Sequence, residues 1–317
     1  MPITRRAMTF GLLGTGVALA AHAGRRLQTM GGPAFGSSWR ISLPNDVDAA
    51  PLRPGIEAIL ARVDAEMSPY RPTSDLSRFN RSSSADWQPM PPALCTVSAA
   101  ALDIARLTHG AFDPTVGPTV SRFGFGPIQG GSGSYRNISV ASGALRKTNP
   151  GLTLDLCGIA KGYALDRVAA FLTDAGVANA LVEIGGEVRA LGLHPQGRDW
   201  QVAIADPRAN TFAPLKIIRS GRLALATSGH AANGLHGPLS TSHIIDPHTG
   251  HPASTTLLSV SVLAPDAMQA DALATALCAA GPDAGIDLAR RLDLAALFAI
   301  DGADDIATGA FPNHVMV

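Results

Sequence analysis

Hydrophobic positions along this chain follow the helical period in some segments and form short continuous runs in others. Residues 52–67 place Ile56, Leu60 and Val63 at helical spacing, which predicts an amphipathic helix. Short apolar runs bounded by turn residues predict buried strands. The other elements predicted in this way are strands at 39–43, 180–184 and 257–263, and helices at about 98–108, at about 162–175 and from about 264 onward.

The most informative segment is 154–192. It begins with an apolar stretch carrying Asp155, predicted to be a strand that breaks at Gly158, and then presents Lys161 at the start of a helix. The following strand ends at the pair Gly185-Gly186. A glycine turn leading into a helix N-terminus is suited to an anionic ligand, and glycines let backbone approach that ligand closely. The alternative is an ordinary crossover with a structural glycine loop.

Composition narrows the class of protein. The 317 residues are 46% hydrophobic, which supports a substantial core, and 25 basic residues balance 25 acidic ones. No basic stripe is present, so a nucleic-acid partner is disfavoured. The three cysteines are far apart and include no CxxC pair, which argues against a disulfide framework or a zinc knuckle.

The N-terminus has the pattern of a targeting segment. The sequence Thr4-Arg5-Arg6 precedes an apolar run at 8–21 and the tripeptide Ala21-His22-Ala23. This pattern predicts a twin-arginine signal peptide over residues 1–23 and a periplasmic domain over 24–317. An uncleaved membrane anchor is the alternative, although the run is short and rich in glycine for a membrane span.

Two oxygen-bearing side chains are spaced by four in the last predicted helix. Asp271 and Thr275 therefore lie on one face of that helix. Exposed together to a phosphate-binding cleft, they would suit a hard cation such as Mg²⁺. Taken alone, the same pair would be a helix-capping carboxylate and a buried hydroxyl.

Four segments carry a resemblance to a known family. They read MSPYRPTSDLSRFN at 67–80, GAFDPTVGP at 110–118, LDLCGIAKGYALD at 154–166 and SHIIDPHTGHP at 242–252. Together they resemble the signatures of the ApbE family, the FAD:protein FMN transferases, over most of residues 30–297. The resemblance implies an α+β fold, a mixed α and β single domain with two lobes around a flavin cleft.

The resemblance also implies a set of site residues. His243 would lie next to the flavin and act as the catalytic base. Mg²⁺ would be held by Asp271, Thr275 and a main-chain oxygen near Gly158. Lys161 would add positive charge at the phosphates, with a structural salt bridge to Asp155 as its alternative. The positions expected to bind FAD are Met30, Tyr70, Ala111, Phe112, Asp113, Asp155, Lys161 and Ile245.

The reaction implied by the resemblance converts FAD and a protein threonine into FMN-threonyl protein and AMP. Such a phosphoryl transfer depends on positioning and charge neutralisation. The expected partner is an acceptor protein with an FMN-binding domain, in a membrane electron-transfer subunit. Two alternatives remain: a periplasmic FAD-binding or storage protein without turnover, and an FAD pyrophosphatase that uses water.

Some positions depart from the family pattern. The run at 230–234 is not acidic or aromatic, Cys157 replaces a small residue, and Ala274 stands where some relatives place another acidic ligand. Five histidines between His230 and His251 raise a zinc site as an alternative. Their spacing matches neither HExxH nor HxxEH, so turn and surface roles are expected.

Overall fold

A computed structural model describes residues 27–131, 133–208, 213–230 and 241–316. The predicted signal peptide at 1–23 lies outside these residues. Among the helices of the described ranges, none combines the length and the hydrophobicity that crossing a bilayer requires.

The largest element is an eight-stranded sheet in which every neighbouring pair of strands is antiparallel. The described residues also form three small sheets. In spatial order, the large sheet contains β1 (Leu27–Ala34), β2 (Ser37–Pro44), β6 (Ala180–Ile184), β7 (Glu187–Leu191), β10 (Ala224–Gly229), β13 (Leu257–Ala264), β14 (Ala295–Ile300) and β15 (Ile306–Thr308). The small sheets are β3 (Gln88–Pro89), β5 (Ala144–Lys147) and β4 (Ile138–Ala141); β8 (Gln201–Ala205) and β9 (Pro214–Arg219); and β11 (Ile245–Asp246) and β12 (His251–Pro252).

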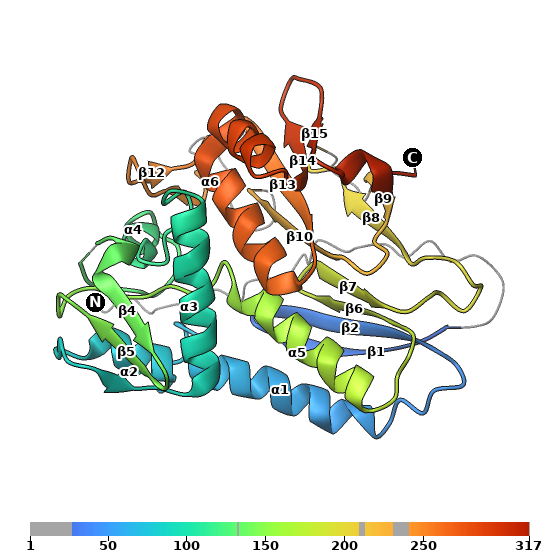
Figure 1. The fold of residues 1–317 in the computed structure, drawn as a ribbon, viewed down its shortest axis with the longest axis horizontal. Helices are drawn as coiled ribbons and strands as arrows, with labels where there is room; N and C mark the ends of the chain where they lie inside the picture. The colour runs from blue at the N-terminus through green and yellow to red at the C-terminus, as the bar shows by residue number, and fades with distance from the viewer. Residues whose placement is uncertain (1–26, 132, 209–212, 231–240, 317) are drawn as a thin grey trace, which may run out of the picture.

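Helices divide the molecule into two parts. Figure 1 shows α5 and α6 against one face of the large sheet, whereas α2, α4 and the strands β4 and β5 lie on the other side of α3. This arrangement confirms the predicted mixed α and β fold class. The helices are α1 (Leu52–Met67), α2 (Asp75–Arg81), α3 (Pro92–Leu107), α4 (Gly117–Arg122), α5 (Ala160–Asp174) and α6 (Ala267–Arg291).

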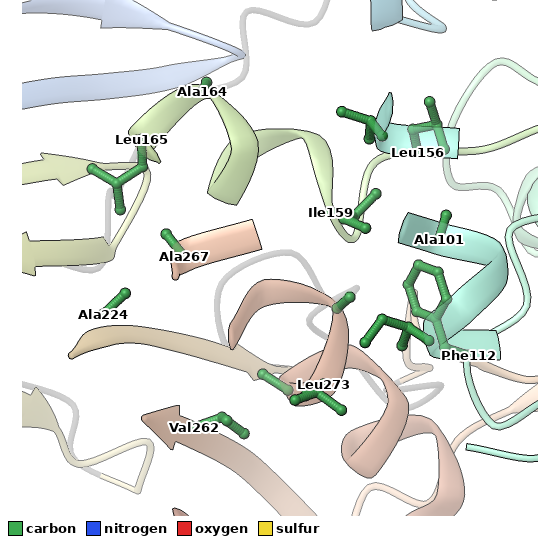
Figure 2. Close-up of a cluster of buried hydrophobic side chains, with 14 of the residues drawn as sticks. Ala101, Phe112, Leu156, Ile159, Ala164, Leu165, Ala224, Val262, Ala267 and Leu273 are labelled. Atoms are coloured by element: carbon green, nitrogen blue, oxygen red, sulfur yellow. The ribbon is translucent and has the colours of Figure 1, made fainter. Parts of the chain in front are cut away.

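Both faces of the large sheet are covered, and the period-two alternation of its strands explains how. Val182 and Val262 face the helical layer, whereas their neighbours Leu181 and Leu263 face a second apolar cluster. That second cluster is completed by Trp200 beside β8 and by other residues of the β8–β9 hairpin and the C-terminal turn. Figure 2 shows part of the helical-side core, including side chains of α5 and α6 and of the segment before α5. The sheet is therefore a rigid central layer between two cores.

Several predicted elements need correction. The helix at 52–67 and the strand at 180–184 have the predicted bounds. The helix predicted from about residue 98 is α3, which starts earlier, at Pro92, because proline is well tolerated in the first turn. Residues 154–156 are not a strand: Leu154 and Leu156 are buried and Asp155 is half-buried, but the segment belongs to no sheet. The pairing of β1 with β2 was not predicted. The last helix runs to Arg291 through a kink at Gly281.

The contact between α5 and α6 is unusually close. A Cβ on Gly162 would lie 2.2 Å from the carbonyl oxygen of Ala267 and 2.8 Å from Cα of Met268. Asp166 of α5 accepts hydrogen bonds from the backbone nitrogens of Ala267 and Met268, both at 3.0 Å. In return, Oδ2 of Asp271 in α6 accepts from Gly162 N at 3.1 Å. Each helix thus satisfies first-turn N–H groups of the other, which helices otherwise leave unpaired.

We expect Gly162→Ala to destabilise the protein. Forcing a methyl group against the α6 backbone should cost about 3 kcal/mol, which exceeds the gain of about 1 kcal/mol in helix propensity. Urea unfolding should therefore show a free energy of unfolding lower by about 2 kcal/mol. Gly151→Ala is the matched control, because its Cβ would meet nothing closer than 3.6 Å. Equal stabilities of the two variants would show that the α5–α6 contact can relax.

Candidate functional site

The segment before α5 is held in place by side chains and backbone far away in the sequence. The Asn80 amide clamps Leu154: Nδ2 donates to Leu154 O at 2.8 Å, and Leu154 N donates to Oδ1 at 2.8 Å. The next residue, Asp155, donates its backbone N–H to Pro114 O at 2.7 Å. Three of the four segments that resemble the family, at 67–80, 110–118 and 154–166, therefore meet at residues 154–155. These bonds replace the strand pairing that the sequence had suggested.

A buried lysine reinforces the same junction. Lys147 is fully buried, and its ammonium donates to the carbonyls of Phe79 at 3.1 Å, Asn80 at 3.1 Å and Leu152 at 3.0 Å. Burial lowers the pKa of this ammonium. Sequence reasoning missed Lys147, although its place two residues after buried Leu145 in β5 puts both on one strand face.

Gly158 lies where the segment meets α6. A Cβ at this position would lie 3.0 Å from Thr275 Oγ1 and 3.2 Å from the ring of Phe112. The Thr275 hydroxyl also lies 3.1 Å from Ser228 Oγ of β10. The structure therefore brings together Gly158 and Thr275, two of the three positions expected to hold a metal.

Asp271, the third of these positions, is buried with 3% of its surface exposed. The expectation that Asp271 is exposed was wrong. The residue lies one turn before Thr275, where α6 packs against the N-terminus of α5. Its carboxylate accepts from Gly162 N at 3.1 Å and lies 3.4 Å from the Lys161 ammonium. Asp271 is thus both a helix cap and part of the site.

Lys161 does not pair with Asp155, which corrects the alternative interpretation of this lysine. Its Nζ lies 2.7 Å from Glu187 Oε1 and 3.4 Å from Asp271 Oδ1. Asp155 instead accepts from Cys157 N at 2.9 Å in a local turn. We refer to Lys161, Glu187 and Asp271 as the Lys161 cluster. Glu187, the first residue of β7, was not predicted, because only the folded hairpin brings it to the lysine.

The cluster combines one partly exposed ammonium with two carboxyl side chains that are only 4% exposed. Burial alone lowers the pKa of Lys161, but the neighbouring Asp271 and Glu187 carboxylates outweigh it, so that pKa lies above its usual range. Burial, followed by the negative charge of Asp271, raises the pKa of Glu187 well above its usual value. Lys161 is therefore a permanent cation, whereas the closeness of Glu187 and Asp271 disfavours a negative charge on both carboxyl groups at once.

His243 lies in a different electrostatic environment. Burial, together with nearby His230 and Lys161, lowers its pKa to about 4. Its ring stands 5.9 Å from that of Phe125, and its buried Nδ1 has no hydrogen-bond partner among the described residues. His243 is therefore a neutral imidazole at physiological pH, able to accept a proton.

The other histidines of this region are dispersed. His230 is bonded through Nε2 to Ser254 O at 3.0 Å, and His251 packs at 6.3 Å from the ring of Phe123. Within the described ranges, no group of three His, Cys, Asp or Glu side chains could hold a metal. His236 and residues 231–234 of the unusual run lie outside those ranges.

The remaining positions expected to bind FAD differ in how exposed their side chains are. Tyr70 is exposed, with 68% of its surface accessible, and lies close enough to the Asp155 carboxylate to interact electrostatically. Asp113 has both oxygens engaged, Oδ1 by Thr115 and Oδ2 by the backbone N–H of Tyr135, so its carboxylate joins its own loop to the segment at Tyr135. The buried side chains are Met30, Ala111, Phe112 and Ile245.

Comparison with known proteins gives the geometry a context. The model of the ApbE family matches residues 35–298. An FAD:protein FMN transferase of Vibrio cholerae is 35% identical over 303 residues, covering 89% of this chain and 91% of that protein. One of Escherichia coli is 33% identical over 305 residues, covering 89% and 86%.

Solved structures agree with this similarity. The flavin transferase ApbE from Vibrio cholerae superposes with a TM-score of 0.82 at 33% identity, covering 91% of this chain and 100% of that one. The apo form of the Pseudomonas stutzeri flavinyl transferase ApbE gives 0.81 at 32% identity, covering 91% and 96%. The similarity therefore extends over nearly the whole described domain.

Proposed function

The chain belongs to the ApbE family and is an FAD:protein FMN transferase; from this premise, we propose that it uses Mg²⁺ to transfer FMN from FAD to a threonine hydroxyl of an acceptor protein, with AMP as the leaving group. The observation that carries this proposal is the convergence of Gly158, Lys161, Asp271 and Thr275 at the N-terminus of α5. The acceptor would be a protein with an FMN-binding domain, in a membrane electron-transfer subunit.

The residues present fit a magnesium ion. Mg²⁺ prefers oxygen ligands and is usually held by one or two carboxylates plus substrate phosphates. Asp271 offers a carboxylate, Thr275 a hydroxyl and Gly158 a main-chain carbonyl, and Gly158 and Thr275 are in close contact. When bound, the ion would stabilise negative charge on the pyrophosphate.

Lys161 and the start of α5 would bind the phosphates of FAD. The ammonium has three protons, and its contacts to Glu187 and Asp271 leave one for a ligand. Its side chain is 32% exposed, so the group is accessible. The N-terminus of the 15-residue helix α5 adds a partial positive charge.

The flavin and adenosine parts would be held by less polar positions. Exposed Tyr70 offers an aromatic face for stacking, and Asp155 lies beside it. Met30, Ile245 and the 111–113 loop would line the pocket; since their side chains are mostly buried, we propose that their main chain makes the contacts.

His243 would take the proton from the acceptor threonine. A hydroxyl is a weak nucleophile at neutral pH, so a positioned base helps its attack. The neutral imidazole of His243 has the protonation state that this role needs.

Asp271→Asn should abolish flavin transfer. Asparagine can still accept from Gly162 N but lacks the charge for the cation, so we expect at least a roughly 100-fold loss. Incubation with FAD, Mg²⁺ and an acceptor domain, followed by in-gel flavin fluorescence and AMP quantification, measures this. Asp287→Asn on the exposed side of the same helix is the control. Full activity of Asp271→Asn, or of the wild type in excess chelator, contradicts the metal assignment. Asp271→Ala is less informative, because loss of the cap should also reduce stability.

The base role of His243 predicts a particular pH profile. His243→Gln should lower turnover by roughly 10²–10⁴-fold while leaving FAD affinity nearly unchanged. With a pKa of about 4, the wild-type histidine is already deprotonated at pH 6, so its rate should be flat from pH 6 to 8 and fall only near pH 4–5. Parallel losses of affinity and turnover would instead indicate that His243 only shapes the pocket.

We propose that the enzyme is exported to the periplasm through the twin-arginine route. This rests on Arg5 and Arg6 and the apolar run that follows. Changing both arginines to lysine should leave the precursor in the cytoplasm, because the export receptor recognises the pair itself. Fractionation of cells expressing each form is the measurement. Normal periplasmic amounts of the double-lysine form would favour the general secretory route.

A further inference from the structure

The Lys161 ammonium is shared unequally between two buried carboxylates. It lies 2.7 Å from Glu187 and 3.4 Å from Asp271, and each carboxylate side chain is only 4% exposed. The closer partner, Glu187, is on β7, whereas Asp271 is on α6. Two different elements therefore compete for one cation.

The position of Glu187 is fixed by the hairpin that precedes it. Gly185 and Gly186 have φ values of +60° and +95°, as a tight two-residue hairpin turn requires. A Cβ on Gly185 would lie 3.6 Å from Cδ and 3.8 Å from Cε of Lys161, so the lysine stem runs along this turn. The position of Glu187, which anchors the Lys161 ammonium, is thus set by the sheet and does not depend on α6.

We propose that Glu187 is a positioning residue that holds the Lys161 ammonium away from Asp271 and so keeps the Asp271 carboxylate available to a divalent cation. The inference rests on the proposed metal function of Asp271. Without Glu187, Asp271 would be the remaining partner of the ammonium in the cluster, and the ammonium would move onto it. It would then occupy oxygen lone pairs and repel an incoming cation, since charge interactions strengthen as distance falls.

A second observation agrees with this role. Oε2 of Glu187 is buried and has no hydrogen-bond partner among the described residues. The cluster thus sets two carboxyl groups against one ammonium, and a cation next to Asp271 would offset the repulsion between them. Glu187 would affect the divalent cation only through Lys161, and it is not itself assigned as a metal ligand.

Direct Mn²⁺ binding to the FAD-free protein tests this inference. Calorimetric titration should give a dissociation constant at least roughly tenfold higher for Glu187→Met, which removes the anchor while keeping the side-chain volume. Glu187→Gln retains an acceptor for the ammonium, so it should give an intermediate increase. Glu183→Gln, on the neighbouring strand, should match the wild type. Thermal melting by circular dichroism verifies that each variant is folded; if Glu187→Met is not, Glu187→Gln carries the test.

The double variant Lys161→Met/Glu187→Met separates positioning from ligation. If Glu187 only restrains the lysine, removing the lysine as well should restore Mn²⁺ affinity to the wild-type value or better. Persistently weak binding of the double variant would make Glu187 a direct ligand and overturn the proposal, as would wild-type affinity in folded Glu187→Met or Glu187→Gln.

Asp271→Asn keeps the two levels of inference apart. If the wild type binds Mn²⁺ and Asp271→Asn does not, the metal function stands whatever the Glu187 variants show. If Asp271→Asn binds as the wild type does, the metal assignment fails and the role of Glu187 fails with it.

Discussion

The close contact between the first turns of α5 and α6 is the constraint on which the site depends. Only a glycine at 162 lets the two backbones meet, and the carboxylates of Asp166 and Asp271 then satisfy N–H groups across the contact. Thr275 lies one turn after Asp271 in α6, so the same helix position brings Thr275 against Gly158. The packing of α5 against α6 therefore also brings the residues of the candidate site together.

Two opposed electrostatic environments lie close together at the candidate site. Around Lys161, clustered charges keep an ammonium protonated, whereas around His243 burial and positive neighbours keep an imidazole neutral. A phosphate-neutralising cation and a proton acceptor need these opposite states. Pairs of groups whose surroundings push their pKa values apart are typical of acid–base and phosphoryl-transfer sites.

Local pattern predicted a minority of the regular elements, and it did not predict the connections between them. Periodicity gave the bounds of α1 and β6, because the signal lies within the element itself. It mistook residues 154–156 for a strand, since an apolar run looks the same whether a sheet or the Asn80 amide pairs its backbone.

For the site, spacing placed Asp271 and Thr275 on one face of α6. The burial of Asp271 and its contacts could not be read from that spacing, because they come from α5 and β7. Glu187 and Lys147 were missed for the same reason: their partners are distant in sequence. The recognised motifs indicated which positions matter, whereas tertiary contacts decide what each one does.

Lys147 has a consequence for how this sequence can change. Its ammonium donates to main-chain carbonyls at Phe79, Asn80 and Leu152, and it also lies 5.2 Å from the centre of the Phe79 ring. Carbonyls are common to all residues, so these three hydrogen bonds by themselves place no demand on side-chain identity at the partner positions. The lysine itself has no such freedom, because without it the three carbonyls lose a charged donor. The hydrogen bonds of Lys147 therefore constrain position 147 more than its partners, whereas the Asn80 amide and the Phe79 ring are constrained by contacts of their own.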